Sequence, residues 1–215
     1  MGFRQSTMQV SAEIRWFWMG PGPCELDAWF RDPERHPCPP GGGGSRTDEY
    51  LRDDGQEELG IKRRGGQKAI EVKGLVAALG EIRTAPFVGR VELWTKWTSE
   101  ALEVPPAASV RTDKRRWVRR FSTDGQVPVE VALDGSERPV TGSPPARGCN
   151  VELTEVRIGS VWWTLGFESF GAIDTVEADL RTVAALLARE RRPPSLDGWK
   201  LASYPRWLND VRRHP

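Results

Sequence analysis

An alternation of apolar and charged residues with a period of two runs through much of this chain, and it constrains the fold more than any other feature. Successive side chains of a β-strand point to opposite faces, so this period predicts strands. Residues 11–20, SAEIRWFWMG, are a clear case. The two faces of this strand are formed by Ile14, Trp16 and Trp18 on one side and by Glu13, Arg15 and Phe17 on the other. One face is therefore apolar, and the other begins with two charges.

Segments of this kind follow one another with short connections through most of the sequence. Strand character is found in residues 10–18, 46–51, 57–64, 67–75, 87–99, 109–122, 126–134, 149–158 and 161–171. Gly-Gly at 65–66 and Gly-Ser at 159–160 are two-residue turn signals of β-hairpins. Eight or nine strands joined this tightly predict a mainly antiparallel sheet.

The remaining segments have a different character. Residues 174–194 carry one apolar stripe, formed by Val176, Leu180, Val183 and Leu187, which predicts an amphipathic helix. A second short helix is expected from about Ser203. Residues 31–45, rich in Pro and Gly, are expected to form a flexible loop, and LDAWF at 26–30 a short docked turn or helix. The sequence thus predicts a single domain, residues 1–215, of the α+β class and mainly β, with a flexible Pro/Gly-rich insertion.

Composition narrows the function classes. The 215 residues include 31 Lys plus Arg and 30 Asp plus Glu, so no global charge favours nucleic acid or a membrane surface. No run approaches the roughly 20 apolar residues of a membrane helix, and the N-terminus lacks the apolar core of a signal peptide. The expectation is a cytoplasmic protein without a membrane segment. Three cysteines and two histidines argue against a disulfide framework and against histidine-based catalysis.

The charged strand faces allow two interpretations. In the first, they are the solvated face of an antiparallel sheet and keep it soluble. In the second, the sheet closes into a barrel and the charges point inwards, which makes a polar tunnel. Phosphate-rich ligands suit such a tunnel, because Arg and Lys supply charge-assisted hydrogen bonds.

Six segments occur in an order that resembles a known family. They are EIRWF at 13–17, Asp48 with Tyr50, Lys62 with Arg64, Glu71 with Lys73, Glu168 before the long helix, and Ser203, Tyr204 and Leu208 at the end. This order is similar to that of the CYTH domain, the triphosphate tunnel metalloenzyme superfamily that includes class IV adenylate cyclase and thiamine triphosphatase. The resemblance spans most of the chain. It implies a closed or nearly closed antiparallel barrel of about eight strands with the C-terminal helix packed against it.

The resemblance also implies a site for phosphate and a metal ion, but this sequence departs from the family's signature strand. In the family's Glu-x-Glu-x-Lys strand only Glu13 is retained, because Arg15 replaces the second glutamate and Phe17 the lysine. We expect Arg15, Lys62, Arg64, Lys73, Lys96 and Arg120 to bind phosphates. Glu13 and Glu168 are the expected catalytic carboxylates, and with Glu152 they are the expected ligands of Mg²⁺ or Mn²⁺. Anion binding is better supported than hydrolysis, because an arginine repels a cation where the family binds one.

Three functions remain open at this point. The first is a small phosphorylated ligand bound in the tunnel with divalent-metal-dependent triphosphate hydrolysis. The second keeps the fold as a noncatalytic module that binds a phosphorylated ligand or partner. The third is a nucleic-acid-binding β domain that uses DKRRWVRR at 113–120, where basic residues flank a tryptophan.

Overall fold

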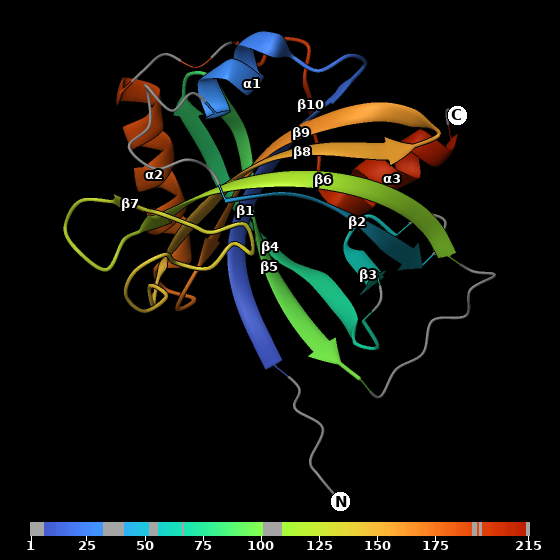
Figure 1. Ribbon diagram of the computed structural model, residues 1–215, viewed down its shortest axis with the longest axis horizontal. Coiled ribbons are helices and arrows are strands. Elements are labelled where there is room, and N and C mark those ends of the chain that lie inside the picture. The colour runs from blue at the N-terminus through green and yellow to red at the C-terminus, as the bar shows by residue number, and fades with distance from the viewer. Residues whose placement is uncertain are drawn as a thin grey trace, which may run out of the picture.

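The barrel is closed. A computed structural model describes residues 7–31, 41–51, 56–65, 67–100, 109–190, 193 and 195–213. Eight antiparallel strands follow the order β1-β5-β4-β3-β2-β6-β8-β9, and β9 pairs with β1 to complete the circle. Their bounds are β1 Thr7–Met19, β2 Gly41–Leu51, β3 Leu59–Arg64, β4 Ile70–Thr84, β5 Phe87–Ser99, β6 Ser109–Ser122, β8 Gly148–Ile158 and β9 Ser160–Phe170. The predicted fold class is confirmed (Figure 1).

Two short strands and three helices complete the described chain. β7 (Val129–Val131) pairs with β6, and β10 (Lys200–Leu201) pairs with β1. The helices are α1 Cys24–Arg31, α2 Val176–Glu190 and α3 Tyr204–Arg213, so the long helix and the short C-terminal helix lie where the sequence predicts them. Figure 1 shows α2 and α3 at opposite sides of the barrel. No helix in the described residues is long and apolar enough to cross a membrane.

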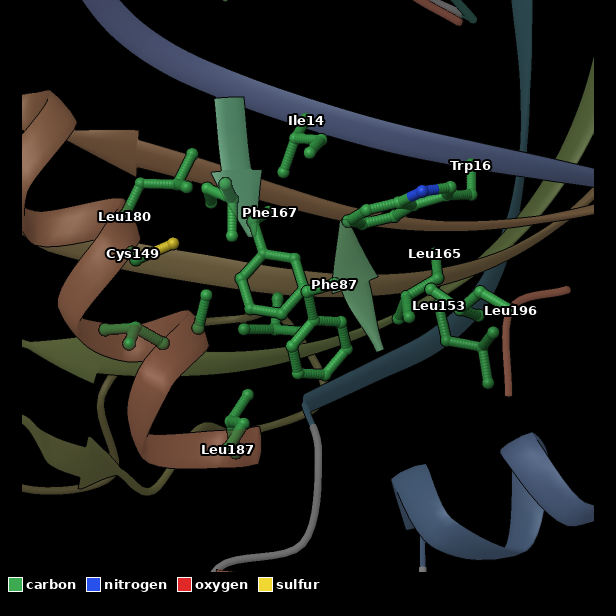
Figure 2. Close-up of a cluster of buried hydrophobic side chains, with 14 of the residues drawn as sticks. Ile14, Trp16, Phe87, Cys149, Leu153, Leu165, Phe167, Leu180, Leu187 and Leu196 are labelled. Atoms are coloured by element: carbon green, nitrogen blue, oxygen red, sulfur yellow. The ribbon is translucent and has the colours of Figure 1, made fainter. Parts of the chain in front are cut away.

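The apolar strand faces point out of the barrel. On β1, β8 and β9 they carry Ile14, Trp16, Val151, Leu153, Leu165 and Phe167, which are buried in one cluster with α1 and α2. All four residues of the predicted stripe on α2 are buried in the same cluster. Figure 2 shows α2 lying along these strands with Leu180, Leu187 and Phe167 between them. Each fully buried aliphatic or aromatic side chain contributes about 1.5–3 kcal/mol, so this outer core turns the alternate, charged faces inwards.

A second apolar cluster closes one end of the barrel. Phe17 on β1 stacks on Trp207 of α3, with ring centroids 4.7 Å apart and an interplanar angle of 8°. The cluster also holds Tyr50, Val156 and Leu208. Phe17 shares its strand face with Glu13 and Arg15. The aromatic residue at this position therefore packs against the C-terminal helix at one end of the charged interior.

The prediction of a flexible loop at 31–45 is wrong at both ends of that range. Arg31 ends α1, and residues 41–45 belong to β2. A glycine run forms a strand here because Gly42 and Gly43 have φ of +97° and +85°, which L side chains rarely adopt, and because the register to β6 shifts between Gly42 and Ser45. Residues 32–40 lie outside the described residues.

Candidate functional site

The inward faces of the strands enclose a cavity of ≈220 Å³. Its charged lining consists of nine basic residues, Arg15, Arg46, Lys62, Arg64, Lys73, Lys96, Lys114, Arg116 and Arg120, and four acidic ones, Glu71, Glu137, Glu152 and Glu168. All six predicted phosphate-binding residues are among them. Glu13 lines an adjacent cavity of ≈120 Å³ that shares Arg15 and Tyr204 with the first. Asp48 and Glu13 also pair with lining cations, so nine basic groups meet six carboxylates and the interior holds a surplus of positive charge.

The Arg15 side chain crosses over β9 at Gly166, where the lack of a side chain leaves space for its guanidinium. In the register, Gly166 of β9 lies between Arg15 on β1 and Glu152 on β8. A Cβ at Gly166 would lie 2.4 Å from Arg15 Cζ, so only glycine leaves room for the guanidinium. Arg15 Nη2 donates to Glu152 Oε2 at 2.8 Å and Nη1 to Thr164 Oγ1 at 3.2 Å. Arg15 is only 6% exposed, and both of its Nη atoms have a hydrogen-bond partner, as a buried charge requires.

Glu152 links Arg15 to a second arginine. Arg116 Nη1 donates to Glu152 Oε1 at 2.8 Å, and Arg116 Nε donates to Glu137 Oε1 at 3.0 Å. Although burial alone would raise it, the two guanidinium groups hold the pKa of Glu152 well below its usual range. The result is a chain of alternating charges from Arg15 to Glu137 along one wall of the cavity.

Asp48 is the centre of a second cluster. Its buried carboxylate has Lys114 Nζ at 3.2 Å, Arg46 Nε at 3.4 Å and Lys62 Nζ at 3.6 Å. Lys114 also donates to the Tyr50 hydroxyl at 2.6 Å. One carboxylate thus serves three cations. Burial lowers the pKa of Lys114 well below its ordinary value, and Asp48 opposes this shift only in part.

Glu71 and Glu13 hold the remaining paired cations. Glu71 has Lys62 at 3.1 Å and Arg64 at 3.0 Å. Lys73 donates to Glu13, which lies opposite Glu168 in the β1–β9 register. Burial raises the pKa of Glu13, and Glu168 adds to the increase while Lys73 opposes it.

Two lining cations have no carboxylate of their own. Arg120 Nε donates to Asn150 Oδ1 at 2.8 Å and Nη1 to the Glu137 backbone carbonyl at 3.3 Å, both neutral acceptors. Lys96 is half-buried and makes no ion pair with any described residue, although its charge helps to lower the pKa of Glu71, which already pairs with Lys62 and Arg64. A buried cation without a close carboxylate gains most from an added anion. Arg120 and Lys96 are therefore well placed to bind one.

Two of the three predicted metal ligands, Glu152 and Glu13, already pair with basic side chains, and the third, Glu168, lies opposite Glu13 in the β1–β9 register. Glu152 presents one oxygen to Arg15 and the other to Arg116. Glu13 accepts from Ser11 through one oxygen and from Lys73 through the other. Within the described residues, no group of three or more His, Cys, Asp or Glu side chains is placed to hold a metal ion. We therefore derive no chemical step through a metal.

Several lining residues were not among the predicted site residues, namely Arg46, Lys114, Arg116, Glu137 and Tyr204. Lys114 and Arg116 share the inward face of β6 with Arg120, so the period of two along 114–120 is the signal that would have identified them. Tyr204 comes from α3, and its ring lies 5.0 Å from Arg15 and 4.0 Å from Lys114. Nothing in the local sequence places Glu137 inside the barrel.

Outward-facing arginines are mostly paired with acids on neighbouring positions. The pairs are Arg63 with Glu49, Arg119 with Glu130, Arg111 with Asp113 and Arg157 with Glu155. Within the DKRRWVRR segment, Lys114, Arg116 and Arg120 line the cavity, Arg119 is paired with Glu130, and the exposed Arg115 contacts the Gly43 carbonyl and the Trp117 ring, so its charges do not form one continuous outer basic surface. Comparison of the chain with protein-family models and with curated proteins found no match.

Proposed function

We propose that the barrel interior binds a phosphorylated anion of the triphosphate class, as a tunnel of the CYTH type. The observation that carries the proposal is the cavity lining, in which nine basic side chains face four acidic ones inside a closed barrel. A phosphate chain offers many acceptor oxygens with several negative charges, and the lower dielectric inside a closed barrel strengthens each charge-assisted hydrogen bond.

The geometry divides the basic residues by role. The guanidinium groups of Arg15 and Arg116 are fixed by Glu152. Arg15, Arg116 and Arg120 have planar forks that suit phosphate oxygens. Lys62, Lys96 and Lys114 supply point charges around them. The carboxylates keep these cations ordered before the ligand arrives, which lowers the entropy cost of binding.

Thermal stability with and without ligand tests the proposal. With tripolyphosphate at about 100 times its dissociation constant, linkage gives about 2.7 kcal/mol, which raises the Tm of a chain of this size by roughly 5–10 °C. Sodium sulfate at equal ionic strength is expected to give much less. The increase is expected with EDTA present as well as with Mg²⁺. Absence of any increase at millimolar tripolyphosphate contradicts the proposal.

Neighbouring residues of β3 supply a matched control. Lys62 and Arg64 point into the cavity, whereas Arg63 between them pairs with Glu49 outside it. Lys62→Ala combined with Arg64→Ala is expected to abolish most of the Tm increase, and Arg63→Ala to leave it intact. Orthophosphate release in the same samples measures whether hydrolysis accompanies binding. Binding of RNA that tripolyphosphate does not compete away, with a steep salt dependence, would instead favour a nucleic-acid-binding domain.

A further inference from the structure

One carboxylate in the cavity does not come from a barrel strand. Glu137 lies in the connection between β7 and β8, in a turn whose other residues, Asp134 to Ser136 and Arg138, are all exposed. The turn is closed locally, because the Asp134 carboxylate accepts from the backbone amides of Ser136 and Arg138. Glu137 itself has φ of +62°, and its side chain lines the cavity. The turn thus places a single carboxylate in the basic cavity.

This carboxylate occupies an edge of Arg116 that is suited to phosphate. Arg116 donates to it through both Nε and Nη2, so the two groups form a fork. The backbone of the neighbouring β2 leaves space for the pair, since a Cβ at Gly42 would lie 2.6 Å from the Arg116 carbonyl and 3.3 Å from Glu137 Oε1. The glycine run of β2 therefore lies directly against the Arg116–Glu137 contact.

Glu137 is the more exposed of the two carboxylate partners of Arg116. Its other partner, Glu152, stands on β8 in the barrel wall and is also held by Arg15. The side chain of Glu137 is 24% exposed, against 7% for Glu152. A turn with so few buried side chains moves at a small cost in buried apolar area, and a partly exposed ion pair is weaker than a buried one.

We propose that Glu137 is a specificity-determining residue, which occupies Arg116 in the absence of ligand and is replaced there by a phosphate group of the bound anion. The inference rests on the proposed function. A ligand then has to present two acceptor oxygens to the Nε edge of Arg116 and to outcompete a carboxylate. Tripolyphosphate meets both requirements, whereas chloride and acetate meet at most one.

Calorimetric titration with tripolyphosphate at fixed pH and salt tests the proposal. Glu137→Gln retains the side-chain length and removes the competing charge, so we expect affinity to rise about five- to tenfold. Glu49→Gln is the matched control, because it removes one carboxylate from an arginine pair outside the barrel. Its affinity is expected to stay within about twofold of the starting protein. Unchanged or weaker binding by a folded Glu137→Gln protein overturns the proposal.

Hydrogen exchange in the unmodified chain provides a second readout that does not depend on any variant. Displacement of Glu137 is expected to speed amide exchange at residues 134–138 when tripolyphosphate binds, while exchange in the barrel strands slows. Slower exchange in that turn would show that Glu137 stays in place, and would overturn the proposal even if the ligand binds. Absence of binding by the unmodified chain and by the Glu137→Gln variant would instead reject the proposed function itself.

Discussion

Replacing Gly166 by alanine places a methyl group in the space that the Arg15 guanidinium occupies. The new Cβ would lie 2.4 Å from Cζ and 2.7 Å from both Nη1 and Nη2. Arg15 is 6% exposed and packs against the Tyr204 ring on one side, so its guanidinium can only retreat into the cavity, away from Glu152 and Thr164. We therefore expect Arg15 to lose its hydrogen bonds to Glu152 and Thr164.

The size of the effect follows from the pair that is broken. Removing one partner of a buried ion pair costs about 3–5 kcal/mol, because the remaining charge stays buried. Glu152 retains Arg116 at 2.8 Å, so the lower end of the range applies. A loss of about 3 kcal/mol lowers the Tm of a 215-residue protein by roughly 6–12 °C.

Urea unfolding with linear extrapolation measures this loss. Gly44→Ala is the control, because no heavy atom lies within 4 Å of its Cβ position, and it is expected to change the free energy of unfolding by less than about 1 kcal/mol. In the Arg15→Ala background the obstructing guanidinium is gone, so Gly166→Ala is expected to cost little. An equal cost in both backgrounds would refute the proposed steric conflict.

Two further predictions concern acid stability and the aromatic end of the barrel. Although burial alone would raise it, Lys62 and Arg64 lower the pKa of Glu71 from 4.5 to about 2. Because the folded-state pKa is the lower one, about 3 kcal/mol of stability is present above pH 4.5 and is lost as pH falls towards 2. Urea unfolding from pH 7 to 3 should show a flatter acid limb for Glu71→Gln, and an unchanged limb would contradict this pairing. Trp207 is fully buried on Phe17, so Trp207→Ala is expected to cost about 3–5 kcal/mol in urea unfolding, and a cost below about 1 kcal/mol would show that α3 does not close the barrel.

The alternation of side chains made the strands predictable, but it could not predict whether the sheet closes into a barrel. An open sheet with a wet face and a closed barrel with a polar interior have the same period of two. The pairing that separates them joins Glu13 to Glu168, far apart in the sequence. The glycine run at 41–44 was predicted as a loop because its composition disfavours a strand, and only the bulge against β6 explains why it pairs.

The site was predictable where its residues lie on alternating strands. Arg15, Lys62 and Lys73 point inwards because their neighbours on either side point out, which is a local property of each segment. Their partners were not predictable in the same way. Glu152 pairs with Arg15 only through the gap at Gly166, and Glu137 reaches the cavity from a turn whose sequence carries no strand pattern.

Whether an anion enters the barrel is tested most directly by titrating tripolyphosphate into the chain and into one inward-facing variant. Lys96 lines the cavity without an ion pair to any described residue, so Lys96→Met removes an anion contact and, within the structure, only a longer-range attraction to Glu71. Lys200→Met is the matched control, because Lys200 pairs with Asp210 outside the cavity. We predict saturable binding by calorimetry, at least about fivefold weaker for Lys96→Met and unchanged for Lys200→Met. No binding, or equal weakening by both variants, would contradict an anion site inside the barrel.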